Sequence, residues 1–370
     1  MYTPKVMPPP RITHAIEWAR GKTRRLIQRV VPAPLGVLEL ASGWMMTQAL
    51  CAAAALGIAD VLVDGPRSAD RIAAEVGADP DATYRLLRAL AGHGVFIELP
   101  DRCFALNSMA DTLRADSPRT VRPVLLMVGH PIVWAARGQL VESVATGRSG
   151  HELAHGIQAF DQMAANPELA SGFNDAMRVT TQMAERAILS AYDFSRFARI
   201  VDVGGGSGYL LAAILRSAPR AKGIVYDLTA ATAEAGKIFT GAGVTERAAI
   251  ENGSFFDATP AGADAYVLKH IIHDWPDEQA LQILHSVRRA IAPRGRLLLI
   301  ECVVPRRNSA HLSVWLDIEV MLAIGGRERT GAEYTELLAR AGFLVRRIVP
   351  TIGPHSIIEA VPNRSGLPLT

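Results

Sequence analysis

Hydrophobic and polar positions follow two different rhythms along the chain. Up to about residue 190 the apolar residues recur mostly at helical spacing. Residues 68–76 and 81–93 predict two helices, and residues 95–99 and 102–106 predict a hairpin of two short strands. Helix, turn, helix and a two-stranded wing are typical of a winged-helix domain. The Ala- and Leu-rich stretch 49–62 predicts a further helix, buried between others.

From residue 199 onward, strands and helices alternate. The pattern predicts strands at 199–203, 223–226, 248–252, 265–269 and 296–301, and helices at 208–217, 229–242, 277–291 and 330–341. This alternation predicts an open parallel sheet covered by helices on both faces. Two last strands, 344–349 and 356–359, are joined by a link too short for a parallel crossover, so we expect them to be antiparallel.

The two rhythms predict an α/β protein with a Rossmann-like, mostly parallel sheet and an N-terminal helical, winged-helix domain. We place the domain boundaries at a basic N-terminal arm 1–35, a winged-helix-like domain 36–110, a helical connector 111–195, the sheet domain 196–362 and a tail 363–370.

Composition narrows the class of protein. With 370 residues the chain is long enough for two domains, and its net charge of +3 gives no general argument for nucleic-acid binding. The three cysteines form no CxxC pair, which favours a reducing cytoplasm. No apolar run approaches the ~20 residues that span a membrane. The basic segment 11–29 is either a solvated helix face or a contact for a membrane surface or anionic partner.

A glycine-rich turn after the strand at 199–203 predicts a cofactor site. In doubly wound sheets, ligands bind at the carboxyl ends of the strands, where glycines let the backbone come close. A dinucleotide fingerprint needs a third glycine where this chain has Tyr209. Asp202 would oppose a pyrophosphate but favours the amino group and sulfonium of S-adenosylmethionine (SAM), and Asp227 is placed to accept from ribose hydroxyls. An NAD oxidoreductase remains the alternative.

Four motifs in order give a specific family resemblance. They are VDVGGGSG, LKHIIHDWPDEQALQIL, RLLLIECVVP and GGRERTGAEY. From about residue 40 to about residue 361 the chain resembles the SAM-dependent O-methyltransferases of the caffeic acid and hydroxyneurosporene type. The resemblance implies a SAM domain, a winged-helix-like dimerisation domain and a homodimer. It also implies a small, hydroxylated acceptor, which we expect to be aromatic or polycyclic, and no metal.

The motif around His273 predicts the chemistry. A hydroxyl is a poor nucleophile until it loses its proton, and an imidazole can accept a proton near neutral pH. In the resembled family the matching histidine is the base, and acids flank it at the positions of Glu301 and Glu328. A carboxylate on an imidazole fixes its tautomer and stabilises the imidazolium. The alternative for Glu328 is an ion pair with a neighbouring arginine. We expect His270 to point elsewhere and to be structural.

The resemblance also assigns the remaining site residues. The cofactor set comprises Asp202, Gly204, Gly206, Asp227, Leu228, Ser254, Phe255, Lys269 and Trp275. Many relatives have Gly-Asp-Phe or Gly-Asp-Met after the third strand, so the serine at 254 is a departure that alters the adenine contact. The acceptor pocket is expected from Phe173, Met177, Met183, Trp315 and Met321, with a further contribution from 124–134, which contains Met127, His130 and Trp134.

Other classes of function compete with this interpretation. A winged-helix regulator would need a basic or amide-rich reading helix, but 81–93 offers only Arg85 and Arg88. A diverged relative could keep SAM for decarboxylation or hydroxylation, against which the histidine and both glutamates argue. Methylation of a nitrogen in place of an oxygen stays open.

Overall fold

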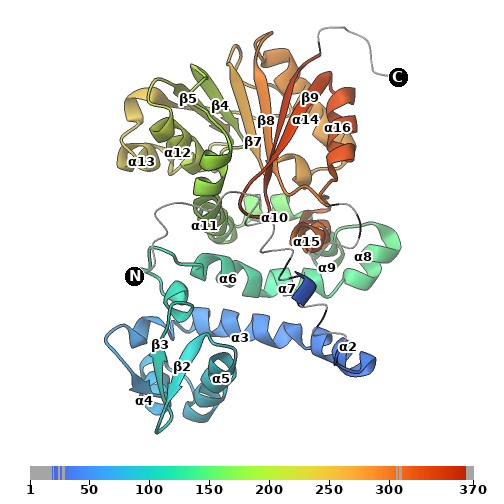
Figure 1. The fold of residues 1–370 in the computed structure, drawn as a ribbon. Coiled ribbons are helices and arrows are strands. Elements are labelled where there is room, and N and C mark those ends of the chain that lie inside the picture. The colour runs from blue at the N-terminus through green and yellow to red at the C-terminus, as the bar shows by residue number, and fades with distance from the viewer. Residues whose placement is uncertain are drawn as a thin grey trace. The chain divides into compact units, whose positions relative to one another are not determined.

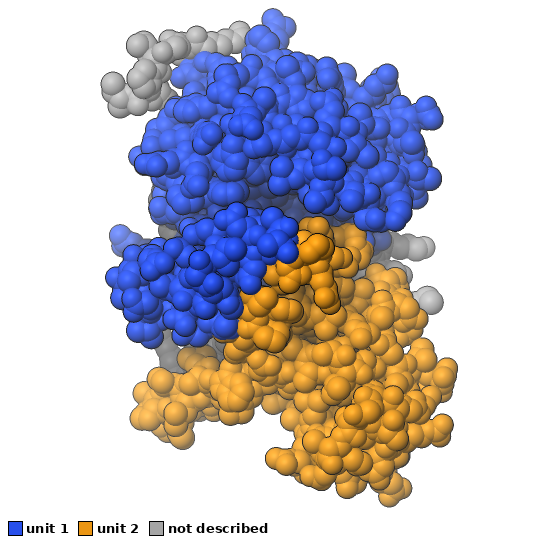
Figure 2. Space-filling model, turned by 180° about the vertical axis from the view of Figure 1, so that it is seen from behind, with its two compact units in different colours: residues 1–23, 135–165, 180–370 blue, residues 24–134, 166–179 orange. Residues whose placement is uncertain are grey.

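The computed structural model describes residues 30–305 and 311–363, with Ala19, residues 21–23, Leu26 and Arg307. Most of the predicted basic arm and of the predicted tail lie outside these residues. The chain forms two compact units (Figure 2): unit 1 holds residues 1–23, 135–165 and 180–370, and unit 2 holds residues 24–134 and 166–179. The domain boundaries drawn from the sequence stay predictions.

Unit 2 contains the helix-turn-helix and the wing. Helix α4 (Ala69–Val76) begins where the Ser68 side chain accepts a hydrogen bond from the Arg71 N–H, and α5 (Pro80–Gly92) begins where Asp79 does the same for Ala82. Strands β2 (Phe96–Leu99) and β3 (Cys103–Leu106) form the hairpin. A short strand β1 (Arg67–Ser68) pairs with β3, so the wing has three strands where the sequence predicted two.

The helix predicted at 49–62 is wrong at both ends. Helix α3 spans Gly43–Ala55, and Asp60–Leu62 form a separate 3-10 turn. Gly57 divides them because its backbone is left-handed, with φ +70°. Helix α6 (Arg122–Gly129) approaches α3 closely: a Cβ built on Gly129 would lie 2.6 Å from Cβ of Cys51.

The remaining helices of the first half are short, apart from one. They are α2 (Ala33–Ala41), the 3-10 turn Ala110–Leu113, α7 (Pro131–Arg137), α8 (Leu140–Thr146), α9 (Gly150–His155), α10 (Ala159–Ala165) and α11 (Pro167–Ala191). The chain passes between the two units along α7 and α11. No helix among the described residues is long and apolar enough to cross a membrane.

Unit 1 is built on a seven-stranded sheet with the order β6-β5-β4-β7-β8-β10-β9 (Figure 1). Its strands are β4 (Arg199–Val203), β5 (Lys222–Asp227), β6 (Ala248–Asn252), β7 (Ala265–Lys269), β8 (Arg296–Glu301), β9 (Phe343–Pro350) and β10 (Ser356–Pro362). Strands β4 to β8 are parallel, whereas β10 is antiparallel to both β8 and β9. This confirms the predicted Rossmann-like fold with its antiparallel end.

Helices cover both faces of this sheet. They are α12 (Tyr209–Ser217), α13 (Ala235–Gly241), α14 (Asp277–Ala290) and α16 (Gly331–Arg340); α15 (Ser313–Ile324) lies between β8 and α16 in sequence. One apolar core joins α14 and α16 to the sheet, and a second joins α12, α13 and the end of α11 to it. The helix predicted at 229–242 is wrong in its first half, which forms turns, and the helix begins only at Ala235. Within these turns the buried Thr232 hydroxyl accepts a hydrogen bond from Asn252 at 2.6 Å.

Candidate active site

The turn after β4 brings backbone close to the sheet edge. Gly204, Gly206 and Gly208 all have positive φ, which only glycine adopts freely. A Cβ on Gly204 would lie 2.3 Å from Cδ1 of Ile271, so this position also needs a hydrogen for space. At Gly206 nothing lies within 4 Å of such a Cβ, and the backbone there is open to a ligand.

Asp202 is a buried carboxylate with one oxygen that has no hydrogen-bond partner among the described residues. Its side chain is 1% exposed, and the oxygen without a partner is Oδ2. Burial raises its pKa to about 7; nearby Lys269 opposes this shift and Asp227 adds to it. Because burying an unpaired charge is costly, the site fits a ligand that brings a cationic group to this oxygen. The ammonium group of SAM meets that requirement.

Asp227 ends β5 opposite the glycine turn. Its Oδ2 accepts a hydrogen bond from the Gly206 N–H at 2.9 Å, and its Oδ1 accepts one from the Leu228 N–H at 2.7 Å. These bonds fix the carboxylate in place at the edge where the ribose of a SAM molecule is expected. The Leu228 side chain is exposed.

Aromatic rings gather beside the turn. Phe255 lies edge-on to Trp275, with ring centroids 6.3 Å apart. Two rings that the sequence did not predict join them: Phe256 is 4.8 Å from Trp275, and Phe160 of α10 stacks on Trp275 at 5.4 Å. The Ser254 hydroxyl accepts a hydrogen bond from the Phe256 N–H at 3.2 Å and so shapes this turn. The cluster offers apolar faces suited to adenine.

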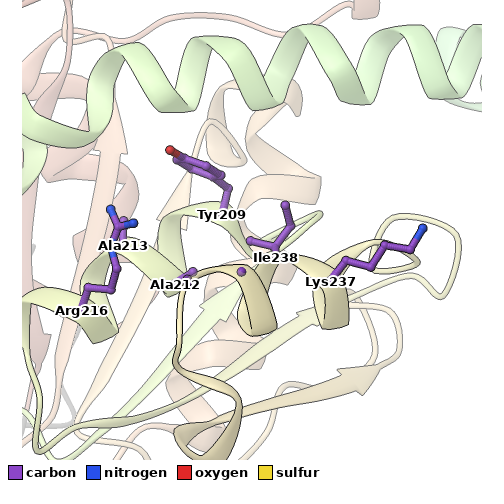
Figure 3. Close-up of a pocket in the computed structure, with 8 residues that line it drawn as sticks. Tyr209, Ala212, Ala213, Arg216, Lys237 and Ile238 are labelled. Atoms are coloured by element: carbon purple, nitrogen blue, oxygen red, sulfur yellow. The ribbon is translucent and has the colours of Figure 1, made fainter. Parts of the chain in front are cut away.

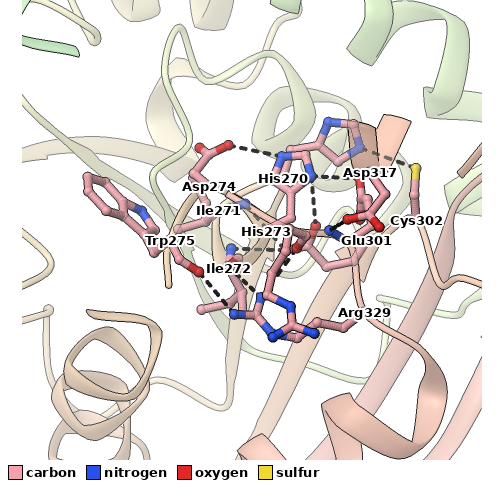
Figure 4. A network of polar contacts seen from close by, with 12 residues as sticks. His270, Ile271, Ile272, His273, Asp274, Trp275, Glu301, Cys302, Asp317 and Arg329 are labelled. Carbon is pink, nitrogen blue, oxygen red and sulfur yellow. Dashed lines mark hydrogen bonds and ion pairs between the residues drawn. The ribbon is translucent and has the colours of Figure 1, made fainter. Parts of the chain in front are cut away.

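His273 lies on the 3-10 turn Ile272–Asp274, directly after β7, and is 7% exposed. Its Nδ1 is 2.8 Å from Oε1 of Glu328, and its Nε2 is 3.1 Å from Oδ1 of Asp274 (Figure 4). Glu301 is fully buried, and its Oε1 accepts hydrogen bonds from the backbone N–H groups of Ile271 and Ile272. The structure therefore brings His273, Glu301 and Glu328 together, as the sequence predicted.

Three carboxylates control the protonation of this imidazole. Burial alone would lower the pKa of His273, but Asp274, Glu301 and Glu328 outweigh it and hold this pKa well above its ordinary value. Burial raises the pKa of Glu301 to about 7, and His273 opposes that shift. The cluster thus favours the imidazolium, the form His273 takes after accepting a proton.

The alternative reading of Glu328 is wrong. Arg327 pairs with Glu333, and Arg329 pairs with Asp277 at 2.7 Å, so neither arginine takes the Glu328 carboxylate. The backbone N–H of Glu328 donates to Asp317 Oδ1 of α15 at 2.8 Å.

Arg329 is a site residue that the sequence analysis missed. It is 1% exposed and donates to the carbonyl oxygens of Ile272 and Trp275, each at 3.0 Å (Figure 4). It also donates to the Asp277 carboxylate. Its guanidinium fork thus holds both ends of the turn that bears His273. The only signal in the sequence was its place next to Glu328.

The expectation that His270 points elsewhere is wrong. Its backbone has φ +55°, which turns its ring back beside that of His273, with centroids 4.7 Å apart. The same ring meets His355 and Cys302, neither of which the sequence analysis singled out. Lys269, the residue before it, ends β7; burial lowers the pKa of its ammonium group, and the nearby Glu301 and Asp202 carboxylates oppose that shift.

The acceptor pocket stays a prediction. Phe173, Met177 and the segment 124–134 belong to unit 2. On α15 of unit 1, Trp315 is 71% exposed and Met321 is half-buried. A pocket of about 240 Å³ lies between α12 and α13, but no predicted site residue lines it. Its residues include Tyr209, Arg216, Lys237 and Ile238 (Figure 3).

Comparison with known proteins decides the family. Residues 138–344 match the model of an O-methyltransferase domain, and residues 38–116 match an O-methyltransferase dimerisation domain. The chain belongs to the O-methyltransferase family. It is therefore a SAM-dependent methyltransferase, and SAM serves this family as methyl donor without a metal.

Relatives of this methyltransferase act on varied molecules. The phenazine O-methyltransferase PhzM of Lysobacter antibioticus is 37% identical over 90% of this chain and 97% of the relative, and its crystal structure has a TM-score of 0.86. An 8-amino-8-demethylriboflavin N,N-dimethyltransferase of Streptomyces davaonensis is 38% identical over 84% of this chain and 90% of the relative. An O-methyltransferase from neocarzinostatin biosynthesis, solved with SAM and 2-hydroxy-5-methyl naphthoic acid, is 33% identical over 86% of this chain and 96% of its own, with a TM-score of 0.75.

Proposed function

We propose that this methyltransferase transfers the methyl group of SAM to a hydroxyl of a small aromatic or polycyclic acceptor, with His273 as the general base. The observation that supports this most is the 2.8 Å contact between His273 Nδ1 and the buried Glu328 carboxylate. Relatives named for phenazine, mitomycin and naphthoate substrates support the acceptor class.

SAM supplies an electrophilic methyl group on a sulfonium. The residues around the glycine turn fit it: Asp202 would bind the ammonium, Asp227 the ribose hydroxyls, and the aromatic faces of Phe255 and Trp275 the adenine. The open backbone at Gly206 leaves room for the ligand. These side chains bind and orient, so much of the rate arises from positioning.

His273 accepts the hydroxyl proton at Nε2. Its Nδ1–H then donates to Glu328, which fixes the tautomer and stabilises the imidazolium. Oδ1 of Asp274 is 3.1 Å from Nε2 of His273. When the acceptor binds, its hydroxyl either replaces Asp274 at Nε2 or shares that atom with it. Glu301 holds the backbone of the turn, and Arg329 closes its far end. The acceptor gains one methyl group and loses one proton, and this proton passes from His273 to solvent after product release.

The base favours oxygen over nitrogen as the acceptor atom. A phenol needs to lose its proton to become a strong nucleophile, whereas a neutral amine already has a free electron pair. One relative is an N,N-dimethyltransferase, so the two outcomes need a direct test.

Trideuteromethyl SAM is incubated with hydroxyphenazine and hydroxynaphthoate acceptors and with their amino analogues. Mass spectrometry with fragmentation should find the label on oxygen; label on the amino analogues alone would contradict the proposal.

We also propose that the protein is a homodimer through its dimerisation domain. Helix α2 has no buried residue in the single chain, and its large apolar side chains are more than half exposed. They are Leu35, Val37, Leu38 and Leu40. An exposed apolar face of this kind is typical of a surface that a second subunit covers.

A further inference from the structure

A second cluster of functional side chains lies next to the proposed base. His270 follows β7, Cys302 follows β8, and His355 precedes β10. The Nε2 atoms of the two histidines are 2.8 Å apart, and Sγ of Cys302 is 4.0 Å from Nε2 of His270. All three ligand atoms lie within 4.8 Å of one another, and the proposed methyl transfer uses none of them.

The three side chains are held by rigid parts of the sheet. His270 donates its backbone N–H to Ile300 at 3.1 Å, and its positive φ aims the ring across the strand ends. A left-handed backbone in a non-glycine residue is costly and marks a position that its surroundings enforce. The His355 carbonyl accepts hydrogen bonds from the N–H and the hydroxyl of buried Thr351. The cluster is thus preorganised and largely buried.

We propose that His270, Cys302 and His355 bind one Zn²⁺ ion or a similar borderline-soft divalent ion, with water in the fourth position. Imidazole nitrogen and thiolate sulfur are the ligands that Zn²⁺ prefers, whereas Mg²⁺ and Ca²⁺ prefer oxygen. This ion is no cofactor of methyl transfer. Its binding displaces the thiol proton, and both imidazoles hold their hydrogen on Nδ1 so that each Nε2 offers a lone pair.

The spacing of the ligand atoms fits such an ion. Tetrahedral Zn²⁺ with its usual bond lengths separates two nitrogens by about 3.3 Å and a nitrogen from a sulfur by about 3.6 Å. The two distances in the structure, 2.8 Å and 4.0 Å, differ from these by about half an ångström in opposite directions. Rotation of the side chains covers that difference. In the free protein a hydrogen bond between the two imidazoles takes the place of the ion.

The neighbouring group of His273, Glu301 and Glu328 is the main competing site. Its atoms also lie within 4.8 Å of one another, but it offers two carboxylates and no sulfur. The His270 and His273 rings are only 4.7 Å apart, so binding alone does not tell the two sites apart. A spectroscopic signature of the Cys302 thiolate distinguishes the two sites.

Cobalt(II) substitution provides that signature. Full-length, untagged, reduced protein is titrated anaerobically with Co²⁺. We expect a thiolate-to-cobalt charge-transfer band and tetrahedral d–d bands that saturate at one equivalent and disappear when Zn²⁺ is added. Cys302→Ala should lose the charge-transfer band, and Cys103→Ala, which changes a free half-buried cysteine of the wing, should keep it. Glu328→Gln should also keep it.

A second variant protects the test against misfolding. His355→Asn keeps a polar side chain at the edge of the sheet and should weaken Zn²⁺ binding by about tenfold or more, with the circular dichroism spectrum unchanged. The proposal is overturned if the unaltered protein shows no charge-transfer band, if the band survives in a folded Cys302→Ala variant, or if folded His355→Asn binds Zn²⁺ as tightly as the unaltered protein. None of these results depends on methyl transfer, so the proposed function stands or falls separately.

Discussion

At the scale of single residues, the site is governed by carboxylates buried around one imidazole and one cofactor position. The sequence predicted the residue types, because His273 follows β7 and Glu301 ends β8 at the same edge of the sheet, while Glu328 lies in the family motif between α15 and α16. It did not predict the directions in which the side chains point. The ring of His270 turns toward His273 because of a positive φ, which no local pattern signals. The Asp274 contact with Nε2 depends in the same way on the 3-10 turn.

Glu328→Gln tests the electrostatic role at this scale. A raised pKa of His273 means that the free base, and with it the rate, appears only as the pH rises through that value. Removing the Glu328 charge lowers the pKa, so the acid limb of the kcat/KM profile should move to lower pH. The plateau of kcat should fall by about tenfold or more because the tautomer is no longer fixed. An acid limb that stays in place would remove Glu328 from this role.

Asp202 predicts a pH dependence of SAM binding. Its carboxyl group ionises at about 7 in the free protein, so affinity for a cationic ammonium should rise with pH up to about 7 and then level off. Without ligand the sign is opposite: the free energy of unfolding falls over the same range, because burial disfavours the ionised Asp202 carboxylate in the folded chain. Asp202→Asn should flatten the dependence and weaken binding by about 1–3 kcal/mol. Calorimetry in two buffers measures both the affinity and the released proton; no proton release would contradict the assignment.

At the scale of elements, the catalytic turn depends on contacts between segments that are distant in sequence. Arg329 holds the carbonyls of Ile272 and Trp275 from a residue more than 50 positions away. Phe160 stacks on Trp275 from a separate helix. The strand and helix periods of the sheet were predictable because each depends on local burial, whereas these contacts depend on tertiary packing. The first half of the predicted 229–242 helix forms turns, and there the Thr232 hydroxyl contacts Asn252 of β6, which is distant in sequence.

Arg329→Met tests the clamp. Loss of hydrogen bonds to one buried and one partly buried carbonyl and to Asp277 should lower the free energy of unfolding by about 1–3 kcal/mol and reduce kcat more than it raises KM for SAM. Arg327→Met is the matched control, since its ion pair with Glu333 is about half exposed, and should change stability by less than about 1 kcal/mol. Thermal unfolding and steady-state kinetics measure both effects. Equal losses in the two variants would show that Arg329 does not position the turn.

For the whole molecule, two different periodicities of hydrophobic residues predicted two kinds of architecture, a helical winged-helix domain and a mostly parallel sheet covered by helices. The alternation of strands and helices predicted a parallel sheet covered by helices, and the short link between the last two strands predicted the antiparallel end. The C-terminal end of α3 was not predicted, because one left-handed glycine ends the helix inside an otherwise continuous apolar run. The partition of the chain into compact units also differs from a simple cut in sequence, since α11 contributes to both.

The proposed homodimer can be tested with a charged substitution on the exposed apolar face of α2. Leu38→Glu places a charge in the middle of the apolar α2 face, so we expect a monomer by light scattering coupled to size exclusion. Leu344→Glu, on the edge strand β9 and also exposed, should leave the dimer intact. A Leu38→Glu variant that elutes and scatters as a dimer would show that subunits meet elsewhere.

His273 is proposed to remove the acceptor proton in a SAM-dependent transfer. The most direct test is the single-turnover rate of methyl transfer to a hydroxylated aromatic acceptor, measured for the unaltered protein and for His273→Ala, with SAM affinity determined in parallel. We expect the rate to fall by about 10²–10⁴-fold while SAM affinity stays nearly constant. A His273→Ala variant that transfers the methyl group at the unaltered rate would contradict the account.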